Sequence, residues 1–362
     1  MFHRRCYPSL FLVLMLAWSL SAQELTFVAI NVWSGLDYKG TLKMGEYESR
    51  KIRLARYGIL LEELRTINPD VIALNEANPL PKYARKLARD LGYDYIYNVG
   101  MAGIKLGCLG IPVNFREGDA ILARKALHLK KAGVKRLSPG SGYIGNCFAF
   151  HFAESNQAIA GRISVGAQSV YVVNTHLHAG LQDDERWLHE MGLIRDSGSI
   201  TDEEYNQLVS TWRQSVERRQ SETRELLQWL DQTLPEDAPN VLMGDFNAVP
   251  TAQEIRWLLA EDYVDTWARM HGSEPGFTWD PNLNLNIQIH YHLPEPDAPV
   301  PWHTKLNAEN EQIRKRIDYI FVKNVPPGYI QRSEIVFEQP VNGLHPSDHF
   351  GVLAVIRFDL TQ

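Results

Sequence analysis

The sequence predicts a layered α/β fold in which polar residues gather at one edge of a β-sheet. Six short apolar runs are typical of buried strands, and each run ends or begins at a polar residue that can bind a metal or a phosphate. Near the N-terminus, two of these runs flank a loop and a helical pattern, which together form a β-loop-α-β unit. Functional groups in such folds collect at the ends of strands, so we expect these polar residues to share one pocket.

Four of the runs lead into a polar residue and two start from one. Thr26–Ile30 leads to Asn31, Val71–Leu74 to Glu76, Val170–Val173 to His176, and Val241–Met243 to Asp245 and Asn247; Asp318 precedes Tyr319–Val322, and Asp348 and His349 precede Phe350–Ile356. If the first four strands run toward one edge and the last two run away from it, all of these residues converge. A pocket that draws on the chain from Asn31 to His349 favours one large domain.

The remaining elements connect these strands. Apolar residues recur at helical spacing from Ile52 to Ile67 and stop before Asn68-Pro69. Further helices are predicted over Pro81–Leu91, within Asp183–Asp202 and over Trp212–Leu230; loops are predicted over Ser34–Glu48, Gly100–Gly118 and the proline-rich His271–Asn310, with a strand over Asp119–Ala123.

The N-terminus has the pattern of a secretory signal peptide. Arg4 and Arg5 precede the apolar run Leu10–Trp18, and small residues follow up to Ala22. The alternative is an uncleaved membrane anchor, but the run is short for a membrane span. We therefore expect a signal peptide over residues 1–22, a single catalytic domain over residues 23–362, and a secreted or periplasmic protein.

Charge and cysteine content constrain the partners and the redox chemistry. The net charge is −6, whereas proteins that bind nucleic acid usually carry a basic surplus or stripe. Nucleic acid is therefore a disfavoured partner, and no stable protein partner is implied. Cys108 and Cys147 remain after signal cleavage; in an exported protein they can form a disulfide or stay as two buried thiols.

The sharpest local motif is Gly244-Asp245-Phe246-Asn247, directly after an apolar strand. Glycine allows a tight turn, aspartate can bind a metal or accept a proton, and asparagine can donate to an anionic oxygen without adding charge. In isolation the motif is also typical of a plain turn closed by an aspartate side chain. Its combination with Thr175–His178 and Ser347–His349 favours a catalytic site.

Carboxylate and amide oxygens are the ligands that hard divalent cations prefer. Glu76 follows a strand that is otherwise apolar, where a buried carboxylate is costly unless it is paired or metal-bound. With Asn31 beside it, this set suits Mg²⁺, or else Mn²⁺ or Ca²⁺. Zinc is disfavoured because the chain has no cysteine cluster and no HExxH pattern.

Two histidines can complete a hydrolytic site. An imidazole titrates near neutrality, so it can take a proton from water or give one to a leaving group. Asp318 is well placed to fix the tautomer of His349.

The ordered motifs resemble the endonuclease/exonuclease/phosphatase superfamily, which has the deoxyribonuclease I-like fold. The matching segments are Asn31-Val32, Asn75-Glu76, Asn174-Thr175-His176-Leu177, Gly244-Asp245-Phe246-Asn247, Arg316-Ile317-Asp318-Tyr319-Ile320-Phe321 and Ser347-Asp348-His349. The resemblance implies a four-layered α/β sandwich with two mixed β-sheets flanked by helices. It also implies metal-assisted hydrolysis of a phosphoester by in-line attack of water.

Carried over by position, the resemblance assigns the metal to Glu76, assisted by Asn31 and Asp348. Some relatives carry an acid that supports the first histidine, and Glu117 stands at the corresponding place.

The resemblance also assigns the catalytic groups. Asp245 and Asn247 are expected to position the phosphate and the attacking water. His349, oriented by Asp318, is the expected general base, and His176 is expected to stabilise the transition state or protonate the leaving oxygen.

The expected substrate class is inferred from a longer sequence match. Thr175-His176-Leu177-His178-Ala179 resembles neutral sphingomyelinases, and export, negative charge and the apolar Gly100–Gly118 stretch fit a lipid at a membrane surface. That stretch fits packing against the core equally well. We expect a sphingomyelinase-like or phospholipase C-like phosphodiesterase. The alternatives are a secreted deoxyribonuclease-type endonuclease and a phosphatase on small esters such as inositol phosphates.

Overall fold

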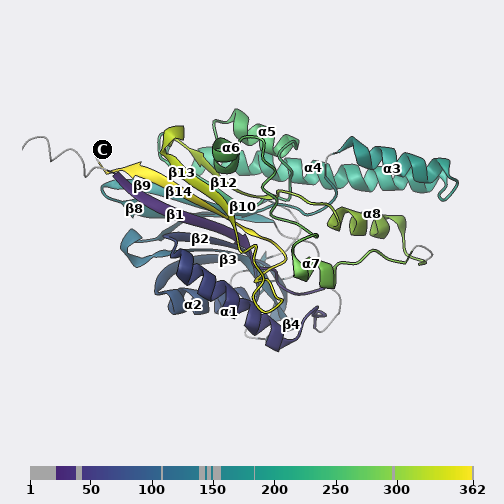
Figure 1. The fold of residues 1–362 in the computed structure, drawn as a ribbon, viewed down its shortest axis with the longest axis horizontal. Coiled ribbons are helices and arrows are strands. Elements are labelled where there is room, and N and C mark those ends of the chain that lie inside the picture. Colours follow the sequence, from purple (N-terminus) through teal and green to yellow (C-terminus); the bar gives the residue numbers. More distant parts are fainter. Residues whose placement is uncertain are drawn as a thin grey trace, which may run out of the picture.

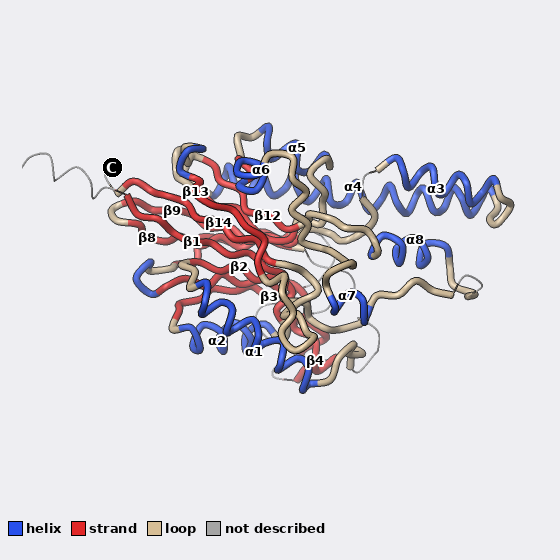
Figure 2. The backbone as a smooth tube through the Cα atoms, in the orientation of Figure 1, coloured by secondary structure: helices blue, strands red, loops and turns tan. Residues whose placement is uncertain are grey.

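The computed structural model describes residues 22–37, 43–106, 109–137, 143–144, 148–149, 156–182, 184–295 and 298–360. Two mixed sheets of six strands each pack face to face, with helices on both outer faces (Figures 1 and 2). This arrangement confirms the predicted four-layered α/β sandwich. Residues 1–21 of the expected signal peptide, Cys108 and Cys147 lie outside the described residues.

The first sheet has the order β13-β14-β1-β2-β4-β3. Its strands are β1 (Ala22–Asn31), β2 (Val71–Ala77), β3 (Tyr93–Leu106), β4 (Leu109–Arg124), β13 (Ile330–Val336) and β14 (Gly351–Asp359). Strands β1 and β2 are parallel, and β14 runs antiparallel to β1.

The second sheet has the order β11-β12-β10-β9-β8-β5. Its strands are β5 (Lys130–Arg136), β8 (Gln157–Val165), β9 (Gln168–His176), β10 (Asn240–Asp245), β11 (Val264–Asp265) and β12 (Asp318–Lys323), and a separate ribbon pairs β6 (Tyr143–Ile144) with β7 (Phe148–Ala149). Strands β9 and β10 are parallel, and β12 is antiparallel to β10. The four strands that end in predicted site residues thus run opposite to the two that start from them, as the sequence predicts.

The central strands are buried on both faces, which explains their continuous apolar runs. In β1, Leu25 and Phe27 belong to the core between the sheets, whereas Val28 and Ile30 pack under the helices of the first sheet. Those helices are α1 (Arg50–Ile67) and α2 (Leu80–Leu91); the second sheet is covered by α4 (Asp202–Thr233), α5 (Gln253–Ala260) and α6 (Thr266–His271).

A small satellite core lies beyond the sandwich. There α3 (Glu185–Asp196) packs with the first half of α4 and with α8 (Trp302–Glu311) through Trp187, Met191 and Trp212. Figure 1 shows α3 and this part of α4 projecting from the sheets. The stretch predicted as one loop, His271–Asn310, contains α7 (Leu285–His290) and most of α8. Among the described residues, no helix combines the length and the apolarity needed to cross a membrane.

The prediction of a surface loop over Gly100–Gly118 is wrong. Strands β3 and β4 pair through this region up to Leu106 and Leu109. The ladder shifts register near Gly118, where a Cβ atom would lie 2.3 Å from the carbonyl oxygen of Asn98. Gly118 therefore permits close backbone approach at a β-bulge, rather than marking a loop.

Candidate active site

Glu76 projects from an irregularity in β2, and two donors hold its carboxylate. The β2–β4 register shifts between Leu74 and Ala77, and Glu76 has a left-handed φ of 55°. The amide nitrogen of Asn31 donates to Glu76 Oε1 at 2.9 Å, and the backbone N–H of Ser34 donates to Oε2 at 3.3 Å. A bulge here turns the side chain out of the strand's alternation and toward the edge of the sheet.

The Oδ2 atom of Asp245 lies close to side chains from both sheets. It accepts a hydrogen bond from Asn31 Nδ2 at 3.1 Å, and it lies 3.6 Å from His176 Nε2 and 3.9 Å from His349 Nε2. The other oxygen, Oδ1, accepts the backbone N–H of Asn247 at 2.9 Å. The turn considered from the sequence is therefore present, and it orients Asp245 toward the two imidazoles.

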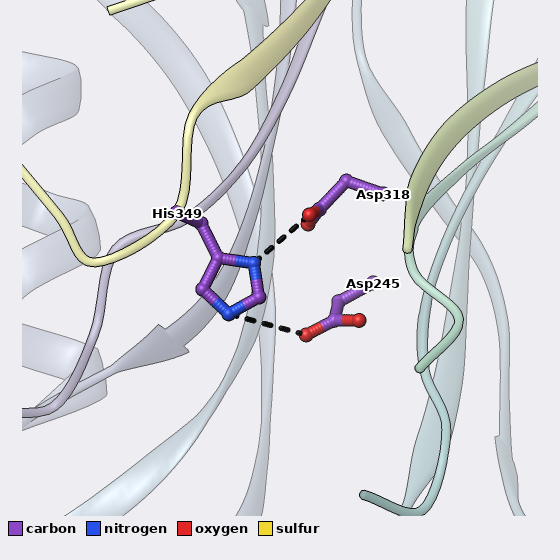
Figure 3. Close-up of side chains that lie close together, drawn as sticks. All are labelled: Asp245, Asp318 and His349. Carbon is purple, nitrogen blue, oxygen red and sulfur yellow. Dashed lines mark hydrogen bonds and ion pairs between the residues drawn. The ribbon is translucent and has the colours of Figure 1, made fainter. Parts of the chain in front are cut away.

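His349 lies between two carboxylates (Figure 3). Its Nδ1 forms a 2.9 Å hydrogen bond with Asp318 Oδ2, so Nε2 is the atom left facing Asp245. The ring of Trp279 packs edge-on against the imidazole, with 5.1 Å between centroids. The Thr278 hydroxyl accepts the backbone N–H of Asp318 at 3.1 Å. The imidazole of His349 is thus restrained by the Asp318 carboxylate on one side and by the Trp279 ring on another.

Asp348 is buried within electrostatic range of His349 and Glu76. Its Oδ2 accepts the hydroxyl of Tyr291 at 3.0 Å. Burial raises the pKa of Asp348 to about 7, and the carboxylate of Glu76 adds to this shift while His349 opposes it.

The pKa of Asp245 is raised for the same reason. Burial, reinforced by Asp318, raises its pKa to about 6 although both imidazoles favour the charged form. Carboxylates whose pKa values rise together lack sufficient positive charge around them. The pocket therefore has the electrostatics of a cation site.

The pKa values of the two histidines are also raised, but by the neighbouring carboxylates and against the effect of burial. Burial would lower the pKa of His176, but Asp245, Glu76 and other carboxylates outweigh it and raise the value to about 9. Glu117 is one of these carboxylates. For His349, Asp318 and Asp245 likewise overcome burial and raise the pKa well above its ordinary value.

Two groups of side chains offer ligands for a metal ion. The donor atoms of Asp245, Asp318 and His349 lie within 4.8 Å of one another. Glu76 and Asp348 offer oxygen alone, which suits a hard cation. Asn31 presents nitrogen rather than oxygen to Glu76, because its Oδ1 accepts the backbone N–H of Trp33 at 3.0 Å. As placed, Asn31 is a donor to carboxylates, and metal binding through its oxygen requires the amide to rotate.

The structure adds a layer of buried amides beneath the site. Asn75 donates to Asp119 Oδ1 at 2.7 Å and accepts the backbone N–H of Asp245 at 3.1 Å, which connects the two sheets. Asn174 donates to the carbonyl oxygens of Leu74 and Ala120. The available sequence signal was an amide at the end of each apolar run, one position before Glu76 and two before His176.

Two further features hold the surrounding loops. Arg56 on α1 donates to the carbonyl oxygens of Val32 and Pro346, and Glu48 neutralises it with a contact of 2.6 Å. His178 does not join the pocket centre, since its Nε2 lies 3.1 Å from Ser215 Oγ on α4.

Comparisons with known proteins agree with this geometry. The profile described as Endonuclease/Exonuclease/phosphatase family matches residues 28–349. D. rerio TDP2 complexed with a single-strand DNA product is similar with a TM-score of 0.55 at 17% identity, covering 93% of this chain and 99% of that one. The human Nocturnin catalytic domain with bound sulfate has a TM-score of 0.51 at 15% identity, covering 93% and 94%.

An endonuclease/exonuclease/phosphatase family protein from Bacteroides thetaiotaomicron has a TM-score of 0.52 at 16% identity, covering 94% of this chain and 99% of that one. No curated protein matches the chain. At these identities the structural likeness establishes the shared fold alone.

Proposed function

The chain belongs to the endonuclease/exonuclease/phosphatase family of metal-dependent phosphoesterases, and we propose that it is a phosphodiesterase acting on a phospholipid. The observation that supports hydrolysis is the position of Asp245 Oδ2, which faces two imidazoles and one amide at the junction of the sheets. General acid and base groups beside a carboxylate that can accept a hydrogen bond from the attacking water suit in-line displacement.

In this proposal the metal belongs to Glu76 and Asp348. Oxygen ligands and raised carboxylate pKa values fit Mg²⁺, and Mn²⁺ and Ca²⁺ accept the same ligands. When bound, such an ion supplies Lewis-acid polarisation of the phosphoryl oxygens.

The chain's own side chains move the protons. His349 is assigned to take a proton from the attacking water at Nε2, because Asp318 occupies Nδ1 and stabilises the resulting imidazolium. Since the surrounding carboxylates raise its pKa, the neutral ring that accepts this proton requires the positive charge that a cation at Glu76 and Asp348 would supply. His176, on the other side of Asp245, gives a proton to the leaving oxygen. Asp245 accepts a hydrogen bond from the attacking water, and the second amide hydrogen of Asn247, whose first donates to the Leu177 carbonyl, is available to a phosphoryl oxygen; together they position water and phosphate.

Three features support a lipid substrate. The expected signal peptide directs the chain out of the cytoplasm, and the net charge of −6 disfavours a polyanionic partner. Ile289 and Leu293 are 54% and 55% exposed and flank Tyr291, which hydrogen-bonds to Asp348. Exposed aliphatic side chains beside a catalytic pocket fit contact with an acyl or interfacial layer.

A nucleic acid is the second candidate. D. rerio TDP2 is known in complex with a single-strand DNA product. Tyr47 is 41% exposed and stacks on the buried Trp33 with 6.0 Å between ring centroids, so its outer face is one on which a base could stack.

A substrate panel tests the proposal. The purified mature chain with Mg²⁺ is assayed on sphingomyelin vesicles, phosphatidylcholine vesicles, single-stranded DNA, plasmid DNA and inositol phosphates. His349→Ala and Glu76→Ala serve as inactive controls after circular dichroism confirms their fold. Lipid turnover that both variants lose supports the proposal; DNA cleavage without lipid turnover contradicts the lipid assignment.

A further inference from the structure

Lys315 is a buried cation whose one counter-charge within 4.0 Å, among the described residues, is the distant carboxylate of Glu311. Its side chain is 5% exposed, and its nearest acid is Glu311, with 3.9 Å between Nζ and Oε2. No hydrogen bond from Nζ to any residue in the described ranges is found, and the only ring beneath the amine is Trp279, at 5.4 Å. An ammonium group largely removed from water needs partners that compensate for the loss of hydration.

The other buried cations of the described chain have such partners. Arg56 lies 2.6 Å from Glu48, Arg219 lies 2.9 Å from Glu254, and Arg316 lies 2.7 Å from Asp265. Arg316 is the direct neighbour of Lys315, so two adjacent cations differ sharply. Arg316 is held by a close ion pair, whereas Lys315 has only the 3.9 Å contact with Glu311.

The backbone places Lys315 beside the catalytic centre. Lys315 and Trp279 exchange backbone hydrogen bonds of 2.8 and 2.9 Å, and the Trp279 ring packs against His349. The amine also lies within electrostatic range of Asp245: burial lowers the pKa of Lys315, while Glu311 and Asp245 oppose that shift. The weakly paired ammonium thus lies beside Trp279, whose ring also packs against His349, and within electrostatic range of Asp245, where the proposed function places the phosphoester.

We propose that Lys315 is a substrate-binding residue whose ammonium contacts the anionic oxygens of the phosphoester. This inference deepens the proposed function and rests on it for the identity of the reaction. A compact ammonium is an effective point charge for a phosphate, and its charge counts most in a buried site where negative charge grows in the transition state. In the absence of the substrate, the weak contact with Glu311 holds the side chain.

The competing explanation is that Lys315 serves only the fold, through Glu311 and Trp279. Two variants separate these roles. Lys315→Met removes the charge and keeps the length of the side chain. Glu311→Gln removes the ion pair but leaves the ammonium in place, and it is the matched control.

The probe is inorganic phosphate, and its dissociation constant is measured by calorimetry on EDTA-treated protein. We expect Lys315→Met to weaken phosphate binding about tenfold or more, and Glu311→Gln to leave it unchanged or tighter. With Mg²⁺ and a substrate that the wild type hydrolyses, Lys315→Met should lower kcat/KM by about a hundredfold. Lys315→Arg, which keeps the charge, should restore part of both losses and also serves if Lys315→Met does not fold.

The inference is overturned if Lys315→Met binds phosphate as tightly as the wild type does. It is also overturned if Lys315→Met and Glu311→Gln show equal decreases in melting temperature and in phosphate affinity. Its failure differs from failure of the proposed function. Lost phosphate binding in Lys315→Met supports the inference whichever substrate the panel identifies. Normal lipid turnover in Lys315→Met would exclude the substrate-binding role of Lys315 and would leave the phosphodiesterase assignment intact.

Discussion

His349 and Asp318 join the two sheets of the sandwich through one hydrogen bond of 2.9 Å. Asp318 opens β12 in the second sheet, and His349 stands two residues before the start of β14 in the first. The pair forms only when the sheets pack face to face, so the proposed base is oriented by the packing of the whole domain.

The first prediction concerns this pair. Asp318→Asn should lower kcat by about a hundredfold or more, because the amide no longer stabilises an imidazolium at His349. Rates are measured with saturating Mg²⁺ on the substrate found by the panel. Asp265→Asn, which alters a buried carboxylate paired with Arg316 away from the pocket, is the control for stability effects. Equal rates for Asp318→Asn and the wild type would contradict the role of Asp318 in orienting His349.

The second prediction concerns the metal. Mg²⁺ at a hundredfold excess over its Kd should stabilise the wild type by about 2.7 kcal/mol, measured from denaturant curves. Glu76→Ala should abolish this gain, whereas the exposed-residue control Glu217→Ala should keep it. Retention of the full gain in Glu76→Ala, together with its loss in Asp318→Ala, would move the ion to the Asp245–Asp318–His349 group.

The third prediction tests the turn that delivers Asp245. Gly244 has a φ of 130°, and a Cβ there would lie 2.1 Å from the carbonyl oxygen of Thr175. Gly244→Ala should cost at least about 2 kcal/mol of unfolding free energy and reduce activity, because backbone must shift at the site. Gly192→Ala in α3 meets no atom within 4 Å and should stabilise by up to about 1 kcal/mol. Thermal or urea unfolding measures both; a harmless Gly244→Ala would contradict the steric argument.

The fourth prediction is a dependence of stability on pH. Hydrogen bonds from Lys86 and Tyr57 lower the pKa of Asp90 to about 2, below the value of about 3.9 in an unfolded chain. A lowered carboxyl pKa stabilises the fold above the unfolded value, and the gain disappears as pH falls toward the folded value. The stability difference between the wild type and Asp90→Asn should therefore be constant above about pH 5 and shrink toward pH 2. A difference that stays constant down to pH 2 would exclude this linkage.

The fifth prediction addresses export. Expression of the full chain in a secretion-competent host should yield an extracellular or periplasmic protein whose N-terminus is at or near Gln23. Intact-mass measurement and N-terminal sequencing determine the cleavage point. Recovery of the uncleaved chain in the membrane fraction would favour the anchor instead.

The sequence alone determined the central strands and the polar residues at their ends. Strands buried on both faces require continuous apolar runs, so Glu76, His176 and Asp245 stand out at the points where such runs stop. The alternation of strand directions needed for convergence is the one observed. The Gly100–Gly118 stretch was misread because glycines at a β-bulge look like glycines in a loop.

Only the tertiary structure decided what surrounds these groups. Tyr291 beside Asp348, Asn75 beneath Asp245 and Lys315 beside Trp279 come from loops or from the opposite sheet. Their positions depend on packing between segments far apart in the chain, and local patterns of hydrophobicity carry no information about such contacts. Periodicity reports the environment of one strand, whereas a site between two sheets is made by their relative placement.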